Sequence, residues 1–283
     1  MILLKRSPSR YIVLALVAAA LYALYAVIVL WQQQPMWVLI LVYFAIAAVF
    51  CFLNRRNIWA VRGNYAYMVN NHERARRLLK RATDAGTKSP TAYIYYALLL
   101  LREDKNYQES LVLLEKAMPY CTNPVYERNL LTAKASCHWL GGDSAAAIDT
   151  LEDMRKRHEY SNAGALTTLG YMYLTSGRFD DAMEVTALAI EDNPAYGAAW
   201  DNLGQINYKQ GDMEAAKENF KLALSKTENL ADAHYFLGLI YEAEGDPETA
   251  KEHFRRASIS TIGIFNTITE EQAQAKYDEY YKA

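Results

Sequence analysis

A period of 34 residues in the C-terminal half constrains this chain more than any other feature. Glycines recur at Gly170, Gly204 and Gly238, and the leucine before each of them keeps the same step. Three further sets share this interval: Ala182, Ala216 and Ala250; Ala189, Ala223 and Ala257; Gly177, Gly211 and Gly245. A fixed interval of this length predicts stacked copies of one supersecondary unit rather than a closed globule.

Each cycle is predicted to contain two helices. In the cycle from Gly197 to Leu230, Trp200, Leu203, Gly204 and Tyr208 form a stripe at helical spacing, and Gly211 with Asp212 ends it. A second stripe follows, made of Ala215, Ala216, Phe220, Ala223 and Leu224. Small side chains let two helices approach closely, so we expect the pair to touch at Gly204 and Ala216.

These residues resemble the tetratricopeptide repeat, whose pattern runs Trp, Leu-Gly, Tyr, Ala, Phe, Ala and a final Pro. The matching residues are Trp200, Leu203, Gly204, Ala216, Phe220 and Ala223, then Leu237, Gly238, Tyr241, Ala250, Phe254 and Ala257, and before them Leu169, Gly170, Tyr173, Ala182, Ala189 and Pro194. His234 and Leu166 replace the Trp, Asn207 stands at the Tyr position and Thr186 replaces the Phe. The resemblance specifies the fold more closely than the function.

Upstream the pattern is weaker but continues, which gives about six helix pairs. We therefore expect an all-α fold in which residues 56–261 form a right-handed α-solenoid and residues 262–283 form a C-terminal capping segment. Its helix should run from Thr269 to about Tyr281, because Thr269 and Gln272 make a capping box. A terminal repeat needs such a cover for its apolar outer face.

Residues 1–55 are predicted to form a transmembrane hairpin. Residues 11–31 contain no charged side chain over 21 positions, and residues 37–53 contain none over a further 17. Both stretches are long enough, or nearly so, to cross a bilayer. A cleaved signal peptide is the competing interpretation, but the first apolar run is too long for one and the second run argues against it.

Basic residues predict the orientation of this hairpin. Lys5, Arg6 and Arg10 precede the first span, Arg55 and two further arginines (Arg56, Arg62) follow the second, and the loop between the spans has no charge. The positive-inside rule then places both termini and the repeats in the cytoplasm, as parts of a two-span membrane protein. Neither span carries a charged residue, which favours a simple anchor over a transport path.

Charge is distributed unevenly along the chain. Residues 1–62 hold six basic and no acidic side chains, whereas residues 91–283 hold 18 basic and 30 acidic ones. The basic side chains of one short predicted helix are Arg74, Arg76, Arg77, Lys80 and Arg81. This cluster is either a solvated helix face or a contact with anionic lipid headgroups. The acidic remainder argues against nucleic-acid binding.

The sequence contains no motif for catalysis, a cofactor or a metal ion. Its three cysteines, Cys51, Cys121 and Cys137, form no CxxC pair, and the five histidines are scattered. A phosphate-binding glycine loop and a serine-nucleophile motif are both missing from the sequence. These observations predict a protein that is not an enzyme.

The resemblance implies that the first helix of each pair lines a concave groove. Residues on that helix outside the Trp/Leu/Gly stripe are the predicted protein-binding set, namely Tyr95, Trp139, Tyr171, Asp201, Gln205, Tyr208 and Tyr235. Aromatic side chains provide contact area at low entropic cost. The alternative is that several of these residues are buried in repeat packing. Because the groove is expected to be acidic, a basic or amphipathic partner segment would fit it.

Two functional hypotheses follow. The first is a membrane-anchored scaffold or adaptor that recruits a protein partner on the cytoplasmic face through its groove, which raises the partner's effective concentration near the bilayer. The second is an integral accessory or assembly subunit of a larger membrane complex, which it contacts through the hairpin. Replacing the hairpin by an unrelated anchor separates the two.

Overall fold

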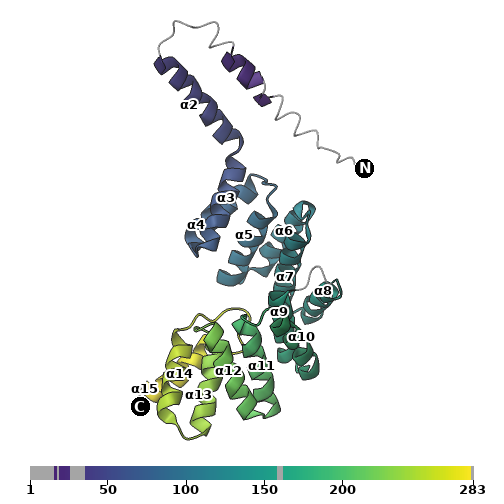
Figure 1. Ribbon diagram of the computed structural model, residues 1–283, viewed down its shortest axis with the longest axis vertical. Helices are drawn as coiled ribbons and strands as arrows, with labels where there is room; N and C mark the ends of the chain where they lie inside the picture. Colours follow the sequence, from purple (N-terminus) through teal and green to yellow (C-terminus); the bar gives the residue numbers. More distant parts are fainter. Residues whose placement is uncertain (1–15, 18, 26–35, 158–161, 282–283) are drawn as a thin grey trace. The chain divides into compact units, whose positions relative to one another are not determined.

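The computed structural model of this protein describes residues 16–17, 19–25, 36–157 and 162–281 (Figure 1). The chain divides into two compact units, Met1–Arg55 and Arg56–Ala283. All regular elements in the described ranges are helices, so the predicted all-α class is confirmed.

The first unit contains helix α2, Met36–Leu53. This 18-residue helix is long and apolar enough to cross a membrane by length and composition, and none of its residues is buried. Most of the first predicted span, residues 11–31, lies outside the described residues. The residues of this span that the structure describes, 16–17 and 19–25, are helical. The described part of the chain thus contains one candidate span, and the two-span hairpin stays a prediction.

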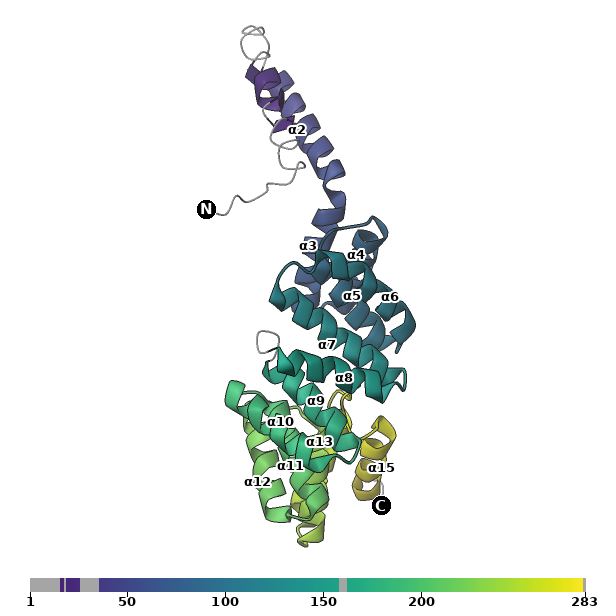
Figure 2. The same ribbon diagram turned by 90° about the vertical axis from the view of Figure 1, so that its right-hand side faces the viewer.

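The second unit is a series of six helix pairs followed by a final helix (Figures 1 and 2). The pairs are α3 (Arg55–Met68) with α4 (His72–Asp84), α5 (Pro90–Glu103) with α6 (Tyr107–Ala117), α7 (Pro124–Leu140) with α8 (Ser144–Lys156), α9 (Ala163–Thr175) with α10 (Phe179–Asp192), α11 (Gly197–Gln210) with α12 (Met213–Lys226), and α13 (Ala231–Ala243) with α14 (Pro247–Ile259). The final helix is α15 (Glu270–Tyr281), and a short 3₁₀ turn, η1 (Met118–Tyr120), follows α6.

The 34-residue period appears directly in the positions at which helices begin. Helices α9, α11 and α13 start at residues 163, 197 and 231, and their partners start at 179, 213 and 247. Upstream the step varies: α5 and α7 start at residues 90 and 124, whereas α7 and α9 start at residues 124 and 163, where α7 has 17 residues and α5 has 14. This longer helix explains why the sequence pattern weakens in the N-terminal half.

The turns inside the pairs have a recurring chemistry. An Asn or Asp side chain accepts a hydrogen bond from the backbone two or three residues into the second helix, as Asn71, Asp143 and Asp246 do. The preceding residue has a positive φ, which glycine adopts without strain, as at Gly211 (φ 87°). Lys105 occupies this position with φ 51° in the α5–α6 turn.

Close helix crossings depend on glycine, although the contact differs from the predicted one. A Cβ atom on Gly204 would lie 2.7 Å from the ring of Phe220, and one on Gly238 would lie 2.6 Å from the ring of Phe254. We predicted that Gly204 would meet Ala216. Ala216 is buried, but the ring one turn later in α12 takes the space that the glycine leaves.

Helix α15 covers the last pair, as predicted. The Thr269 amide donates to Gln272 Oε1 (2.8 Å), and the Gln272 amide donates to Thr269 Oγ1 (3.2 Å), which confirms the capping box. Ala273 is buried against α13, while Lys276 and Tyr280 both bind the Glu242 carboxylate. The segment before this helix, Ser260–Thr269, forms neither helix nor strand. We call it the strap.

Candidate protein-binding surface

The strap lies along the first helices of several pairs, and we call the surface that it contacts the strap face. Its hydrogen-bond partners are Tyr171 on α9, Gln205 on α11 and Asp232 on α13. Tyr171 and Gln205 belong to the predicted protein-binding set. In this structure the first helices therefore contact a non-helical segment of the same chain, and binding of another protein to them stays a prediction.

Asp232 is the centre of the polar contacts. Its carboxylate accepts the backbone N–H of Thr267 at 2.9 Å on one oxygen and that of Ile268 at 3.1 Å on the other. Gln205 Nε2 donates to Asp232 Oδ2 (3.3 Å) and to Asp201 Oδ2 (3.0 Å). The Thr267 hydroxyl donates to Gln205 Oε1. We call Asp201, Gln205 and Asp232 the Asp–Gln–Asp cluster: Asp232 binds the main chain of the strap, Gln205 binds its Thr267 hydroxyl, and Asp201 binds Gln205.

Burial makes this cluster electrostatically unusual. Burial, together with the nearby Asp232 carboxylate, raises the pKa of Asp201 well above its ordinary value. Burial also raises the pKa of Asp232, and the N–H donors of Thr267 and Ile268 oppose that rise. Asp201 Oδ1 has no hydrogen-bond partner among the described residues. Asp232 therefore serves as the anionic acceptor, and Asp201 is the carboxyl group that more readily retains a proton.

An aromatic group holds the middle of the strap. The Tyr171 hydroxyl donates to the Asn266 carbonyl (3.1 Å), and its ring meets the Phe265 ring edge to face at 5.5 Å. Trp139, also in the predicted set, contacts the Tyr171 ring at 6.0 Å. Burial raises the pKa of Tyr171 to about 12, so this phenol remains a donor at neutral pH.

Apolar side chains of the strap join three separate core clusters. Ile264 packs against the cluster of the first three pairs, Phe265 packs against the cluster around α9, and Ile268 belongs to the cluster of α12 to α14. Ile268 is 4% exposed. One short segment therefore contacts most of the stack.

The other three predicted residues pack between helices. Tyr95 stacks on Tyr67 with ring centroids 4.4 Å apart, Tyr208 packs against Phe236, and Tyr235 contacts Phe236 and Phe254. The structure thus gathers Trp139, Tyr171, Asp201 and Gln205 around the strap, and it places Tyr95, Tyr208 and Tyr235 in inter-helix contacts.

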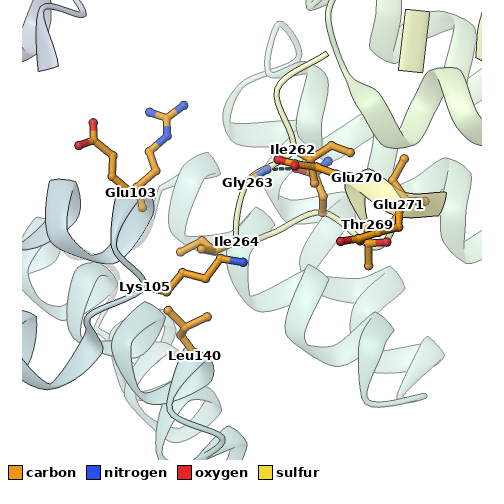
Figure 3. A pocket seen from close by; sticks show the side chains of 12 residues that line it. Glu103, Lys105, Leu140, Ile262, Gly263, Ile264, Thr269, Glu270 and Glu271 are labelled. Atoms are coloured by element: carbon orange, nitrogen blue, oxygen red, sulfur yellow. Dashed lines mark hydrogen bonds between the residues drawn. The ribbon is translucent and has the colours of Figure 1, made fainter. Parts of the chain in front are cut away.

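A pocket of about 480 Å³ remains open beside the strap (Figure 3). Arg102, Glu103 and Lys105 from the end of α5 and its turn line it together with Leu140 of α7, strap residues and the start of α15. Figure 3 shows Ile264 of the strap beside Lys105 and Leu140. The strap therefore does not fill the whole of the strap face.

The predicted lipid-contact cluster on α4 divides into two groups. Arg76 forms ion pairs with Glu103 and Asp104 at 2.7 Å and so links the first two helix pairs. Lys80 pairs with Asp84 on its own helix. Arg74, Arg77 and Arg81 are exposed. The structure thus gives Arg76 a structural role, and contact of the cluster with lipid stays a prediction.

Within the described ranges, no group of three or more His, Cys, Asp or Glu side chains is arranged to hold a metal ion. Cys51, Cys121 and Cys137 are free thiols. Burial raises the pKa of Cys137 to about 12, which makes its thiol a poor nucleophile.

Sequence reasoning found Tyr171, Asp201 and Gln205 but missed Asp232 and the strap residues Phe265, Thr267 and Ile268. One signal was available. The stretch from Ile262 to Ile268 has four large apolar residues and no charge, yet it is too short for another helix pair. A segment of this composition between two predicted helices needs a surface on which to bury its side chains.

Family models described as tetratricopeptide repeat match residues 61–119, 132–197, 197–225 and 231–258, which together make up more than half of the chain. No curated protein matches the sequence.

Several solved structures have a similar fold. A chain of the APC/C hetero-tetramer Cut9–Hcn1 is 18% identical with a TM-score of 0.62, over 80% of this chain and 43% of that one. An IFIT1 monomeric mutant with Gppp-AAAA is 18% identical with a TM-score of 0.61, over 80% and 55%. PilW, a type IV pilus biogenesis factor, is 16% identical with a TM-score of 0.58, over 78% and 98%. The chain thus spans about half of the first two proteins and nearly all of PilW.

Proposed function

Because this chain belongs to the tetratricopeptide repeat family, we propose that it is a non-enzymatic scaffold that binds a partner protein through the strap face. One observation carries the proposal. Asp232 accepts two backbone N–H groups of a non-helical segment, and Gln205, on the preceding first helix, accepts the Thr267 hydroxyl of the same segment. Recognition of main-chain groups is how a protein surface holds a segment whose side chains are only partly specified.

We further propose that the scaffold is attached to a membrane by its N-terminal unit, with both termini and the repeats in the cytoplasm. Helix α2 supports this because it is apolar along its whole length and none of its residues is buried. The basic residues on either side of the two apolar stretches support the orientation. Labelling of single cysteines introduced near residue 34 and near residue 88 in intact cells tests the topology, because only the former should react from outside.

A second function, an accessory subunit of a larger membrane complex, also has support. The exposed apolar surface of α2 fits the helices of another membrane protein as well as it fits lipid. Replacing residues 1–54 by an unrelated two-span anchor distinguishes the functions. Retained partner binding supports the scaffold, and loss of assembly with intact repeats supports the subunit.

The experiment on the scaffold is a quantitative pull-down from detergent extracts with the full chain. The variants are Y171A and Q205A, and the matched control is E191A, which changes an exposed residue of α10. We expect the two strap-face variants to change the recovered amount of specific partners at least about threefold, and the control to leave it unchanged. The same partners at the same recovery from all four proteins would overturn the proposal.

A further inference from the structure

We infer that residues 262–268 are a built-in ligand of the strap face, and that the partner of the proposed scaffold is a protein segment of the same chemistry that binds by displacing them. This inference rests on the proposed function and adds the class of segment and its regulation. The contacts of the strap define both.

The polar contacts show how a segment is held. Two successive amides, those of Thr267 and Ile268, donate to the two oxygens of one buried carboxylate, and the Asn266 carbonyl accepts from Tyr171. These are main-chain groups that any non-proline residue provides. A segment in trans therefore reproduces them if its backbone follows the same path.

The side chains show which segment fits. Apolar residues occupy the first, second and fifth positions of the run Ile264–Ile268, with Phe265 against Tyr171 and Ile268 buried. The fourth position carries a hydroxyl that donates to Gln205. The strap contains no charged residue. The Asn266 side chain at the third position accepts the Gly263 amide and hydrogen-bonds to Asp232. The fitting pattern is thus apolar, aromatic, Asn, Thr or Ser, apolar.

The Asp–Gln–Asp cluster limits which charged residues a binding segment can carry at its fourth position. An Asp or Glu at the fourth position would bring an anion to a cluster that already holds two carboxyl groups in a buried site, which is unfavourable. A Lys or Arg there would have to be desolvated beside Gln205, whose amide already donates to both aspartates. The strap therefore favours an uncharged segment over the basic one expected from the overall acidity of the repeats.

The strap is able to leave without unfolding the repeats. It forms no helix or strand, and an open pocket adjoins it. Helix α15 has its own capping box and its own bonds from Lys276 and Tyr280 to Glu242 on α13. The helix pairs beneath the strap are also joined by glycine crossings such as Gly204 with Phe220, which lie between the two helices of a pair.

Binding in trans to the full chain tests the inference. The probe is a fluorescein-labelled peptide with the sequence of residues 261–270, and the protein is the full chain in detergent micelles. The strap variant is F265A/T267P, because alanine removes the ring against Tyr171 and proline removes one N–H donor to Asp232. The matched control, T267S, keeps the Phe265 ring, the hydroxyl and both donors.

We expect the strap variant to bind the peptide about 10- to 100-fold more tightly than the wild-type chain, which corresponds to a strap docked in about 90–99% of molecules. The control should bind like the wild type. Adding Q205A to the strap variant should weaken peptide binding at least about threefold. A peptide N-methylated at the Thr267 and Ile268 positions should not bind to either protein.

A second measurement uses the wild-type chain and therefore does not require a variant to fold. Excess peptide added to the wild-type chain should accelerate hydrogen exchange of the strap amides, whereas the N-methylated peptide should leave it unchanged. Unchanged exchange at a peptide concentration that saturates the strap variant would overturn the inference. So would equal peptide affinity of the wild-type chain and the strap variant.

Two further outcomes separate this inference from its premise. Failure of the peptide to bind a folded strap variant, while pull-down still depends on Tyr171 and Gln205, overturns the segment class and leaves the scaffold standing. The chain could instead form dimers by exchange of straps between two copies, which a concentration-dependent mass would detect. Such dimers would assign the site to a second copy of the chain and overturn the inference that another protein supplies the segment.

Discussion

The first three helix pairs and the last three close their crossings in different ways. In the first three, Gly63, Ala97 and Ala135 occupy the crossing position, and the residue sixteen places later is Leu79, Leu113 or Leu151. In the last three the crossing residue is always glycine, paired with Thr186, Phe220 or Phe254. The two large rings, Phe220 and Phe254, both face glycine, whereas two of the three leucines face alanine. The third leucine, Leu79, leaves no room for a Cβ atom on Gly63, and Thr186 leaves none on Gly170. The two halves thus fill the helix crossing with different combinations of small and large side chains.

The halves also differ in the polar groups that they bury. Those of the first three pairs and the turns between them are hydroxyls, namely Thr83, Thr87, Ser110 and Ser136. The last three bury two hydroxyls, from Thr167 and Thr186, and in addition two carboxyl groups, two amides and an imidazole, from Asp201, Asp232, Asn202, Gln205 and His234. Hydroxyls do not titrate between pH 4 and 9, so the pH dependence of stability should arise in the C-terminal half.

The largest expected effect comes from G204A, which imposes the crossing residue of the first half on a phenylalanine partner. The added Cβ lies 2.7 Å from the Phe220 ring, so we expect the α11–α12 pair to lose about 2 to 3 kcal/mol. The measurement is hydrogen exchange of the amides in that pair. The double variant G204A/F220L recreates an Ala–Leu pair and should recover much of the loss. A double variant as unstable as G204A would break the comparison.

D201N is expected to stabilise the protein. The raised pKa of Asp201 means that the folded state binds a proton more tightly than the unfolded state. Its contribution to stability is therefore full below about pH 4 and is lost as the pH rises through the folded pKa. At pH 7 the asparagine should gain about 1 to 2 kcal/mol, and this gain should shrink toward pH 4.

Thermal unfolding at pH 7 and pH 5 measures the effect of D201N. The control is D201A, which also has no proton to lose but gives Gln205 Nε2 no acceptor in place of Asp201 Oδ2, and it should be less stable than D201N at both pH values. If D201N gains the same stability at both pH values, ionisation of the Asp201 carboxyl group is not the cause of the gain.

His253 gives the opposite pH dependence. His234 Nε2 donates to the Glu228 carbonyl, so its Nδ1 accepts from His253 Nδ1 at 3.0 Å. Burial and the neighbouring His234 lower the pKa of His253 to about 4. The unfolded state then takes up more protons between about pH 6.5 and pH 4, and stability falls as the pH falls through that window.

H253Q should reduce this loss of folding stability at low pH by about 1 kcal/mol. The value is reduced for solvent screening because the His253 ring is partly exposed. Hydrogen exchange at pH 7 and pH 5 locates the effect, which we expect in α13 and α14 and not in α5 and α6. H253F should abolish the pH dependence equally but lower stability at pH 7, because His234 Nδ1 loses its donor. Equal acid loss in both halves would contradict the assignment.

The smallest effect concerns the turns. Lys105 adopts φ 51° where the last three pairs place a glycine. K105G should stabilise the α5–α6 pair by about 0.5 kcal/mol, since relief of strain exceeds the added freedom of the unfolded chain. The reciprocal change G211K should cost about 1 kcal/mol in α11–α12. Melting temperatures of the two variants that shift in the same direction would contradict this account.

Much of the fold was predictable because the relevant interactions are local. The spacing of Gly170, Gly204 and Gly238 fixed the helix starts, and Thr269 with Gln272 marked the last helix. The site was predictable only in part, because Tyr171 and Asn266 meet across 95 residues, and helical periodicity carries no information on such a contact. Asp201 and Gln205 were predicted to contact a partner protein, and their burial and the contact of Gln205 with the strap became visible only in three dimensions.

The strap runs directly into α15, and this continuity couples two distant properties of the molecule. A ligand that lifts residues 262–268 removes the segment that precedes the capping box of α15, and the helix stays attached to α13 through the bonds of Lys276 and Tyr280 to Glu242. By thermodynamic reciprocity, a molecule that fastens or loosens α15 at the far end of the array changes the affinity of the strap face by the same factor. Binding at the strap face thereby changes binding at α15, and the helix pairs between them do not have to move.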